Sequence, residues 1–119
     1  IASGSEVGLA LEAQEALEAE GTPARVVSMP SWYLFGQQDQ AYRDGVLPPD
    51  VIARVAVEAG STFGWARWIG DAGVAVGIDH FGASAPAETL YERFGVTREE
   101  VVSAARTSLA GTSVRAQRA

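Results

Sequence analysis

Short apolar segments alternate with amphipathic helical segments along the chain, and this alternation most constrains the fold. The chain opens with a strand end at residues 1–2, a helix predicted over 5–20 and a strand over 24–29. This order favours a parallel unit with a right-handed crossover, because the helix must return across one face of the sheet. Further strands are predicted at 51–57 and 74–78. The alternation therefore predicts an α/β protein.

The segment at 51–57 is the strongest strand signal, because apolar residues occupy both of its faces. Such a strand is typical of the centre of a parallel sheet that helices cover on both sides. An aromatic turn or short helix is predicted at 30–35, further helices at 37–44, 85–94 and 97–109, and a loop with one helical turn at 60–70. We expect a three-layer α/β/α sandwich around a small mixed, mostly parallel sheet.

Capping patterns mark the ends of these helices. Ser3 and Glu6 have the spacing of a capping box before the first helix, and Gly21 is placed to end that helix. Thr97 and Glu100 have the same spacing at the start of the last helix. The sequence therefore predicts side-chain caps at both helix starts.

The chain has 119 residues, of which 47% are hydrophobic, and this is enough for one domain with its own core. We expect the domain to cover residues 1–110 and residues 111–119 to form a polar, flexible tail. Ile1 is interpreted as the end of a strand, so we expect a fragment of a larger chain. The sequence contains no signal-peptide pattern and no apolar run of about 18 residues, which a membrane span requires. We expect a cytoplasmic protein.

Composition excludes several classes of function. The net charge of −6 argues against nucleic acid or an anionic membrane as a partner. The absence of cysteine excludes disulfides, zinc–thiolate sites and cysteine nucleophiles. The chain also lacks lysine, which a phosphate-binding P-loop requires.

Five residues are weak candidates for an anion site or an interface: Ser3, Ser5, Asp79, His80 and Ser84. The serines precede predicted helix starts, where free amides attract anions, although an N-cap is the favoured interpretation of each. His80 follows Asp79 at the end of a strand, where α/β proteins bind ligands. Adjacent strand residues point to opposite faces, so we interpret His80 as a surface or interface residue rather than a proton carrier.

Two further groups of side chains lie near predicted loops. Glu58 and Asp79 each end a predicted strand, and we expect them at one edge of the sheet. Six aromatic residues are interpreted as core or domain-interface residues: Trp32, Tyr33, Phe35, Phe63, Trp65 and Trp68.

Six motifs follow one another along residues 1–110: SGSEV at 3–7, VVSMP at 26–30, FGQQD at 35–39 with Tyr42 and VLP at 46–48, RVAVEA at 54–59, GIDHFGASAP at 77–86 and FG at 94–95. In this order they resemble the C-terminal domain of the transketolase family. The residues of the tail, 111–119, lie outside the resemblance.

The resemblance implies an α/β domain without catalytic, cofactor-binding or metal-binding residues. It implies a homodimeric parent enzyme that moves a two-carbon ketol unit from a ketose phosphate to an aldose phosphate. Thiamine diphosphate and magnesium or calcium would be held by the other domains. The segment Gly70-Asp71-Ala72 matches only part of the Gly-Asp-Gly metal motif of such enzymes, and a chain without asparagine cannot complete that motif.

Two alternatives stay open. One is the third domain of a related thiamine diphosphate enzyme: dihydroxyacetone synthase, deoxyxylulose-phosphate synthase or the β subunit of a 2-oxoacid dehydrogenase. The SMP and FGASAP segments favour transketolase over the last two. The other alternative is a stand-alone module that binds an anionic effector at the helix starts near Ser3 and Ser84.

Overall fold

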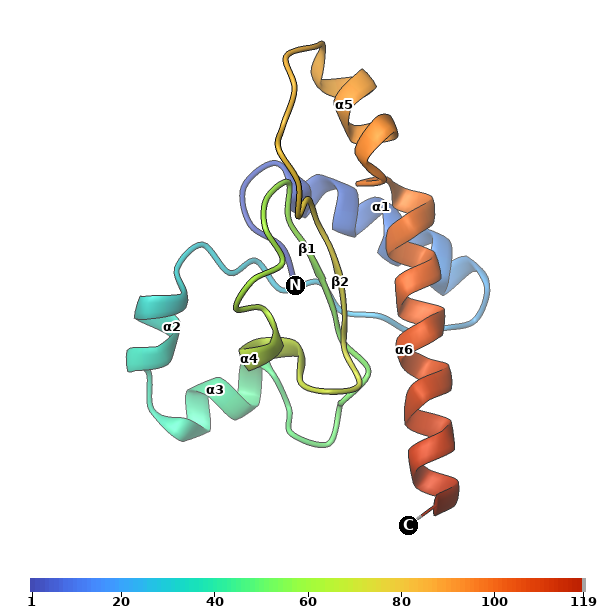
Figure 1. The fold of residues 1–119 in the computed structure, drawn as a ribbon. Coiled ribbons are helices and arrows are strands. Elements are labelled where there is room, and N and C mark those ends of the chain that lie inside the picture. Colours follow the sequence, from blue (N-terminus) through green and yellow to red (C-terminus); the bar gives the residue numbers. More distant parts are fainter. Residues whose placement is uncertain (119) are drawn as a thin grey trace.

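A computed structural model describes residues 1–118, except for the side chains of residues 114–116 and 118. Four chain segments run parallel at its centre (Figure 1). Strands β1 (Val55–Val57) and β2 (Val74–Val76) pair in parallel, and Ala2 forms parallel bridges with Ser28 and Val57. Six helices complete the described chain: α1 (Glu6–Ala19), α2 (Trp32–Gln37), α3 (Gln40–Val46), α4 (Ala66–Ile69), α5 (Ala87–Phe94) and α6 (Arg98–Arg118).

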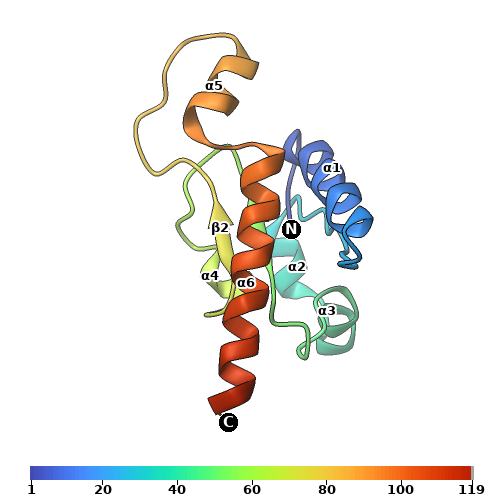
Figure 2. The same ribbon diagram turned by 90° about the vertical axis from the view of Figure 1, so that its right-hand side faces the viewer.

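The helices cover both faces of this parallel array (Figures 1 and 2). Val57 and Val76 pack with α1 and α6 in one apolar cluster, whereas Ala56 and Ala75 pack in a second cluster with α4. Alternate residues of one strand thus enter two different cores, as the pleat requires. The predicted three-layer α/β sandwich is confirmed, and the strands that pair are parallel.

Strand β1 is shorter than predicted, because the Arg54 side chain binds the backbone carbonyl groups near the start of this strand. Its guanidinium donates hydrogen bonds to the carbonyl oxygens of Leu47, Pro48, Val51 and Trp68, at 2.8–3.2 Å. The segment 51–54 therefore turns about this side chain, and only Val55–Val57 remain in the ladder. Residues 24–29 likewise contribute one bridge at Ser28 rather than a full strand.

The predicted capping box at the first helix is wrong. Helix α1 has Ser5 at its N-cap, without a side-chain capping bond. Ser3 lies two residues before this N-cap, and its hydroxyl donates to Glu58 Oε2 at 2.7 Å instead. At the other end of α1 the prediction is confirmed: Gly21 follows the C-cap with a φ of 82°, and its N–H donates to the Glu18 carbonyl.

The segment between Ser28 and β1 forms two short helices. Helix α2 confirms the turn or short helix predicted at 30–35, whereas α3 begins at Gln40, inside the helix predicted at 37–44. Ser31 caps α2 by accepting from Leu34 N, and Asp39 caps α3 by accepting from Tyr42 N. The carboxylate of Asp39 thus starts a new helix inside the range predicted to be continuous.

The last two helices differ from prediction at their ends. The predicted cap of α5 was Ser84, but Pro86 occupies the N-cap position and the helix begins at Ala87. Thr97 caps α6 as predicted, and the helix continues past the expected end at Leu109. The flexibility predicted for the tail stays a prediction, and Ala119 lies outside the described residues.

Candidate functional site

The carboxyl ends of the four parallel segments meet at one edge of the array, which we call the carboxyl edge. In space the segments lie in the order Ser28, Ala2, β1, β2, whereas in the chain Ala2 comes first. The strand order therefore reverses between Ala2 and β1. Open α/β sheets bind ligands outside the carboxyl ends at such a reversal. This is the place where the fold would position a site.

The reversal point is occupied by paired polar side chains. Ser3 and Glu58, which follow Ala2 and β1, are joined by the 2.7 Å hydrogen bond between them. Beside them Glu6 is 4% exposed, and its Oε1 accepts from Tyr91 at 2.5 Å and from Ser5 Oγ at 3.2 Å. The hydrogen bond to Glu6 raises the pKa of Tyr91 above its ordinary value.

A second polar group lies farther along the same edge, after β2. Asp79 accepts from Thr62 N at 2.8 Å, from Thr62 Oγ1 at 2.6 Å and from Ser61 Oγ at 3.2 Å. The bonds from Thr62 lower the pKa of this carboxyl group. Glu58 and Asp79 follow neighbouring strands, so their predicted place at one edge is confirmed, but each has its own partner.

His80 is exposed and its ring packs edge-on against Phe94, with 4.7 Å between ring centroids. Its Nδ1 lies 2.8 Å from the carbonyl oxygen of Phe81, to which it donates in the matching tautomer. The bonds of Asp79 go to Ser61 and Thr62, so this carboxylate does not orient the ring. The geometry is that of a surface histidine.

The serines do not gather into one site. Ser3 and Ser5 each donate to a glutamate, while Ser84 is exposed on the segment before α5. Anion binding at these three residues stays a prediction, although the carboxylates beside Ser3 and Ser5 repel an anion.

The aromatic residues separate into two groups. Trp65 and Trp68 are buried, and Trp32 and Phe35 pack edge-on against them with centroids 4.9 and 5.1 Å apart. These four belong to the core cluster beside α4, as predicted. Tyr33 and Phe63 are largely exposed, together with Phe81, which the sequence analysis did not single out.

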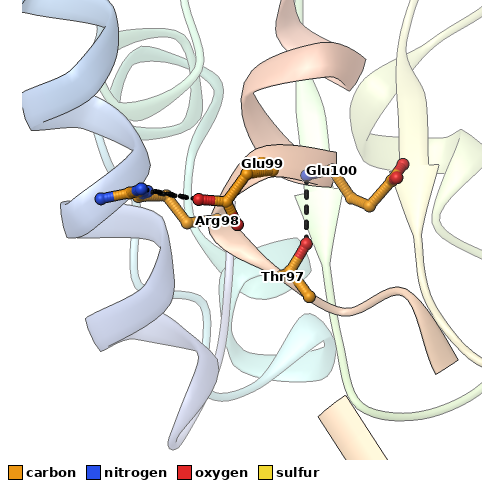
Figure 3. A network of polar contacts seen from close by, with 4 residues as sticks. All are labelled: Thr97, Arg98, Glu99 and Glu100. Atoms are coloured by element: carbon orange, nitrogen blue, oxygen red, sulfur yellow. Dashed lines mark hydrogen bonds and ion pairs between the residues drawn. The ribbon is translucent and has the colours of Figure 1, made fainter. Parts of the chain in front are cut away.

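In two other places, the polar side chains named below are already hydrogen-bonded or ion-paired. A groove of about 200 Å³ lies between α1, α6 and residues 46–55, and it is mostly apolar. On its wall Gln14 and Arg25 already donate to the carbonyl oxygens of Ala24 and Val46. At the start of α6, Thr97 accepts from Glu100 N and Arg98 pairs with Glu99 at 2.6 Å (Figure 3), and Arg98, Glu99 and Glu100 are exposed.

Comparison with known proteins decides the family. The model of the transketolase-like TK C-terminal domain matches residues 1–97. The chain belongs to this transketolase family. It is 58% identical over 106 residues to transketolase 7 of Craterostigma plantagineum, covering 89% of this chain and 16% of that protein.

Solved structures agree. A transketolase from Leishmania mexicana superposes with a TM-score of 0.82 at 47% identity, covering 92% of this chain and 16% of that one. A Pichia stipitis transketolase in complex with sedoheptulose-7-phosphate superposes with a TM-score of 0.81 at 37% identity, over 94% of this chain and 16% of that one. The chain therefore spans about one-sixth of the length of these transketolases.

The transketolase family implies thiamine diphosphate and a metal ion in the full enzyme. Within residues 1–118 no three histidine, aspartate or glutamate side chains gather as metal ligands. Asp71, the one acidic residue of the partial metal motif, precedes β2 and so lies away from the carboxyl edge. In the same part of the chain, no helix is long and apolar enough to cross a membrane.

Proposed function

We propose that this chain is the C-terminal, non-catalytic domain of a transketolase. The parent enzyme transfers a two-carbon ketol unit between a ketose phosphate and an aldose phosphate. Thiamine diphosphate and magnesium or calcium bind to its other domains, and it works as a homodimer of the pentose phosphate pathway. A cytoplasmic location, expected from the sequence, belongs to the same proposal.

One observation carries this proposal: the carboxylates of the carboxyl edge are paired with neighbouring side chains. Ser3 binds Glu58, Tyr91 binds Glu6, and Asp79 binds Thr62. A catalytic centre holds acids, bases or donors ready for the substrate rather than for one another. Satisfied groups instead stabilise the fold of the edge, which supports a structural role.

The two cores support the same role. One lies between the parallel strands and helices α1 and α6, and the other lies beside α4. A domain with cores on both faces of its sheet resists deformation and can hold surface loops in fixed positions. We infer that the domain supports the assembly of the parent enzyme.

The proposal is tested by cofactor binding. We expect calorimetry to show that the full-length enzyme binds thiamine diphosphate with magnesium, whereas the chain of residues 1–119 gives no binding heat. Circular dichroism of the same chain serves as the control for folding. Saturable binding by the folded 119-residue chain would contradict the proposal.

A further inference from the structure

Two phenylalanine side chains stand almost wholly in solvent at the carboxyl edge. Phe63 is 89% exposed and Phe81 is 99% exposed, the highest values among the large apolar side chains of the described residues. Phe63 lies on the loop that follows β1, and Phe81 lies on the loop that follows β2. Because β1 and β2 are neighbours, the two loops leave the sheet side by side (Figure 1).

Hydrogen bonds tie the two loops to each other immediately beside these residues. Asp79 accepts from the backbone and hydroxyl of Thr62 and from the hydroxyl of Ser61. The same Ser61 oxygen accepts from Phe63 N at 3.1 Å. The loop that carries Phe63 is therefore fastened to the start of the loop that carries Phe81.

The start of the second loop has a further contact, made by His80. The His80 ring packs against Phe94 at the end of α5, and its Nδ1 bonds to the Phe81 carbonyl oxygen. Asp79 and His80, the two residues before Phe81, are thus held in place, and the Phe81 side chain that follows them is exposed.

Exposed aromatic side chains can indicate an interface with another protein or domain. Single apolar residues are common on protein surfaces, but aromatic residues on fixed neighbouring loops are enriched at the centres of interfaces. A rigid loop loses little entropy when a partner covers it.

We propose that Phe63 and Phe81 are the contact through which this domain docks onto another domain of the same transketolase polypeptide. The proposal rests on the proposed function. The relatives extend far beyond the matched part, since the chain covers 16% of the Craterostigma enzyme, so that such a domain is available to cover the patch. The complementary face would be apolar, because the two exposed side chains that it covers are both phenylalanines.

Cysteine labelling in the full-length enzyme tests the proposal. Phe63→Cys, Phe81→Cys and, as the matched control, Tyr33→Cys are introduced singly; Tyr33 is 73% exposed on α2, and the 119 residues contain no native cysteine. Labelling with a maleimide is followed by peptide mass spectrometry, and each rate is divided by the rate in the unfolded enzyme. We expect Phe63→Cys and Phe81→Cys to react at least tenfold more slowly than Tyr33→Cys.

Both phenyl rings are exposed within the domain itself, so their protection must come from outside it. Equal labelling of all three cysteines would overturn the proposal. Protection that disappears on dilution to monomers would also overturn it, because the cover would then be the partner subunit. Hydrogen exchange of the unmodified enzyme gives a second measurement, with slow exchange expected at residues 79–84. These readouts are independent of cofactor binding, so this proposal can fail while the proposed function holds.

Discussion

Glu6 is an acidic side chain buried at the point where the strand order reverses, and Tyr91 is the residue that makes its burial tolerable. A buried carboxylate is costly unless hydrogen bonds satisfy it. Tyr91 comes from α5, 85 residues away in sequence, and its hydroxyl lies 2.5 Å from Glu6 Oε1. This contact joins α5 to the start of α1.

Replacing Tyr91 should therefore destabilise the domain. We expect Tyr91→Phe to lower the free energy of unfolding by about 1.5–3 kcal/mol, because a buried carboxylate loses the shorter of the two hydrogen bonds that it accepts from Tyr91 and Ser5. Urea denaturation measures this change. Tyr33→Phe, at an exposed position, is the control and should stay within about 0.5 kcal/mol of the wild type. A loss no larger than that of the control would contradict the assignment.

Asp79 makes the junction of the two loops dependent on pH. Its pKa is lowered in the folded state, first by the hydrogen bonds from Thr62. Its contribution is therefore complete above the unfolded value of about 3.9 and is lost as the pH falls through the lower folded value. We expect the protection factor of the Thr62 amide, measured by NMR hydrogen exchange, to fall over this acidic range.

Asp79→Asn should lower the protection factor of the Thr62 amide already at pH 6, because the charged acceptor is gone. Glu12→Gln, an exposed change on α1, is the control. Unchanged exchange of Thr62 in Asp79→Asn would show that the carboxylate does not hold the loops.

Among the elements, α6 is the one most firmly tied to the rest of the fold by a single polar residue. Ser108 is 1% exposed, donates to the Ala72 carbonyl at 2.7 Å and accepts from Arg54 N at 3.1 Å. It thereby satisfies one backbone group before β1 and one before β2, at the amino ends of the two strands. The sequence shows only a serine in an amphipathic helix, so this function was not predictable from it.

Ser108→Ala should cost about 1–3 kcal/mol of unfolding free energy, since a partly buried N–H and a partly buried C=O lose their partner. Ser103→Ala lies on the same helix at an exposed position and should change stability by less than about 0.5 kcal/mol. Thermal or urea unfolding compares the two variants. Equal stabilities would contradict the bridging function.

Sequence periodicity predicted helices well and strand lengths poorly, for a physical reason. The amphipathic pattern of α1 and the Thr97 cap of α6 are local signals, and both are confirmed. The length of β1 depends on Arg54, whose four carbonyl partners come from as far as Trp68. Likewise Ser3 had the right spacing for a cap, but a partner 55 residues away, Glu58, binds its hydroxyl instead.

At the scale of the whole molecule, the sequence predicted the layers and the family but not the organisation of the carboxyl edge. Six motifs within residues 1–97 gave the resemblance that the family match confirms, and they required no tertiary information. The reversal of strand order between Ala2 and β1 could not be predicted, because it depends on which segments pair. The exposure of Phe81 was equally hidden, since a phenylalanine in a sequence is expected to be buried.

The central claim is that this domain contributes structure rather than chemistry to a transketolase. The most direct measurement is ketol transfer by the folded 119-residue chain, supplied with thiamine diphosphate, magnesium, a ketose phosphate and an aldose phosphate. The full-length enzyme under the same conditions is the positive control. The account predicts turnover by the full-length enzyme and none above background by the 119-residue chain. Ketol transfer by the chain alone would contradict it.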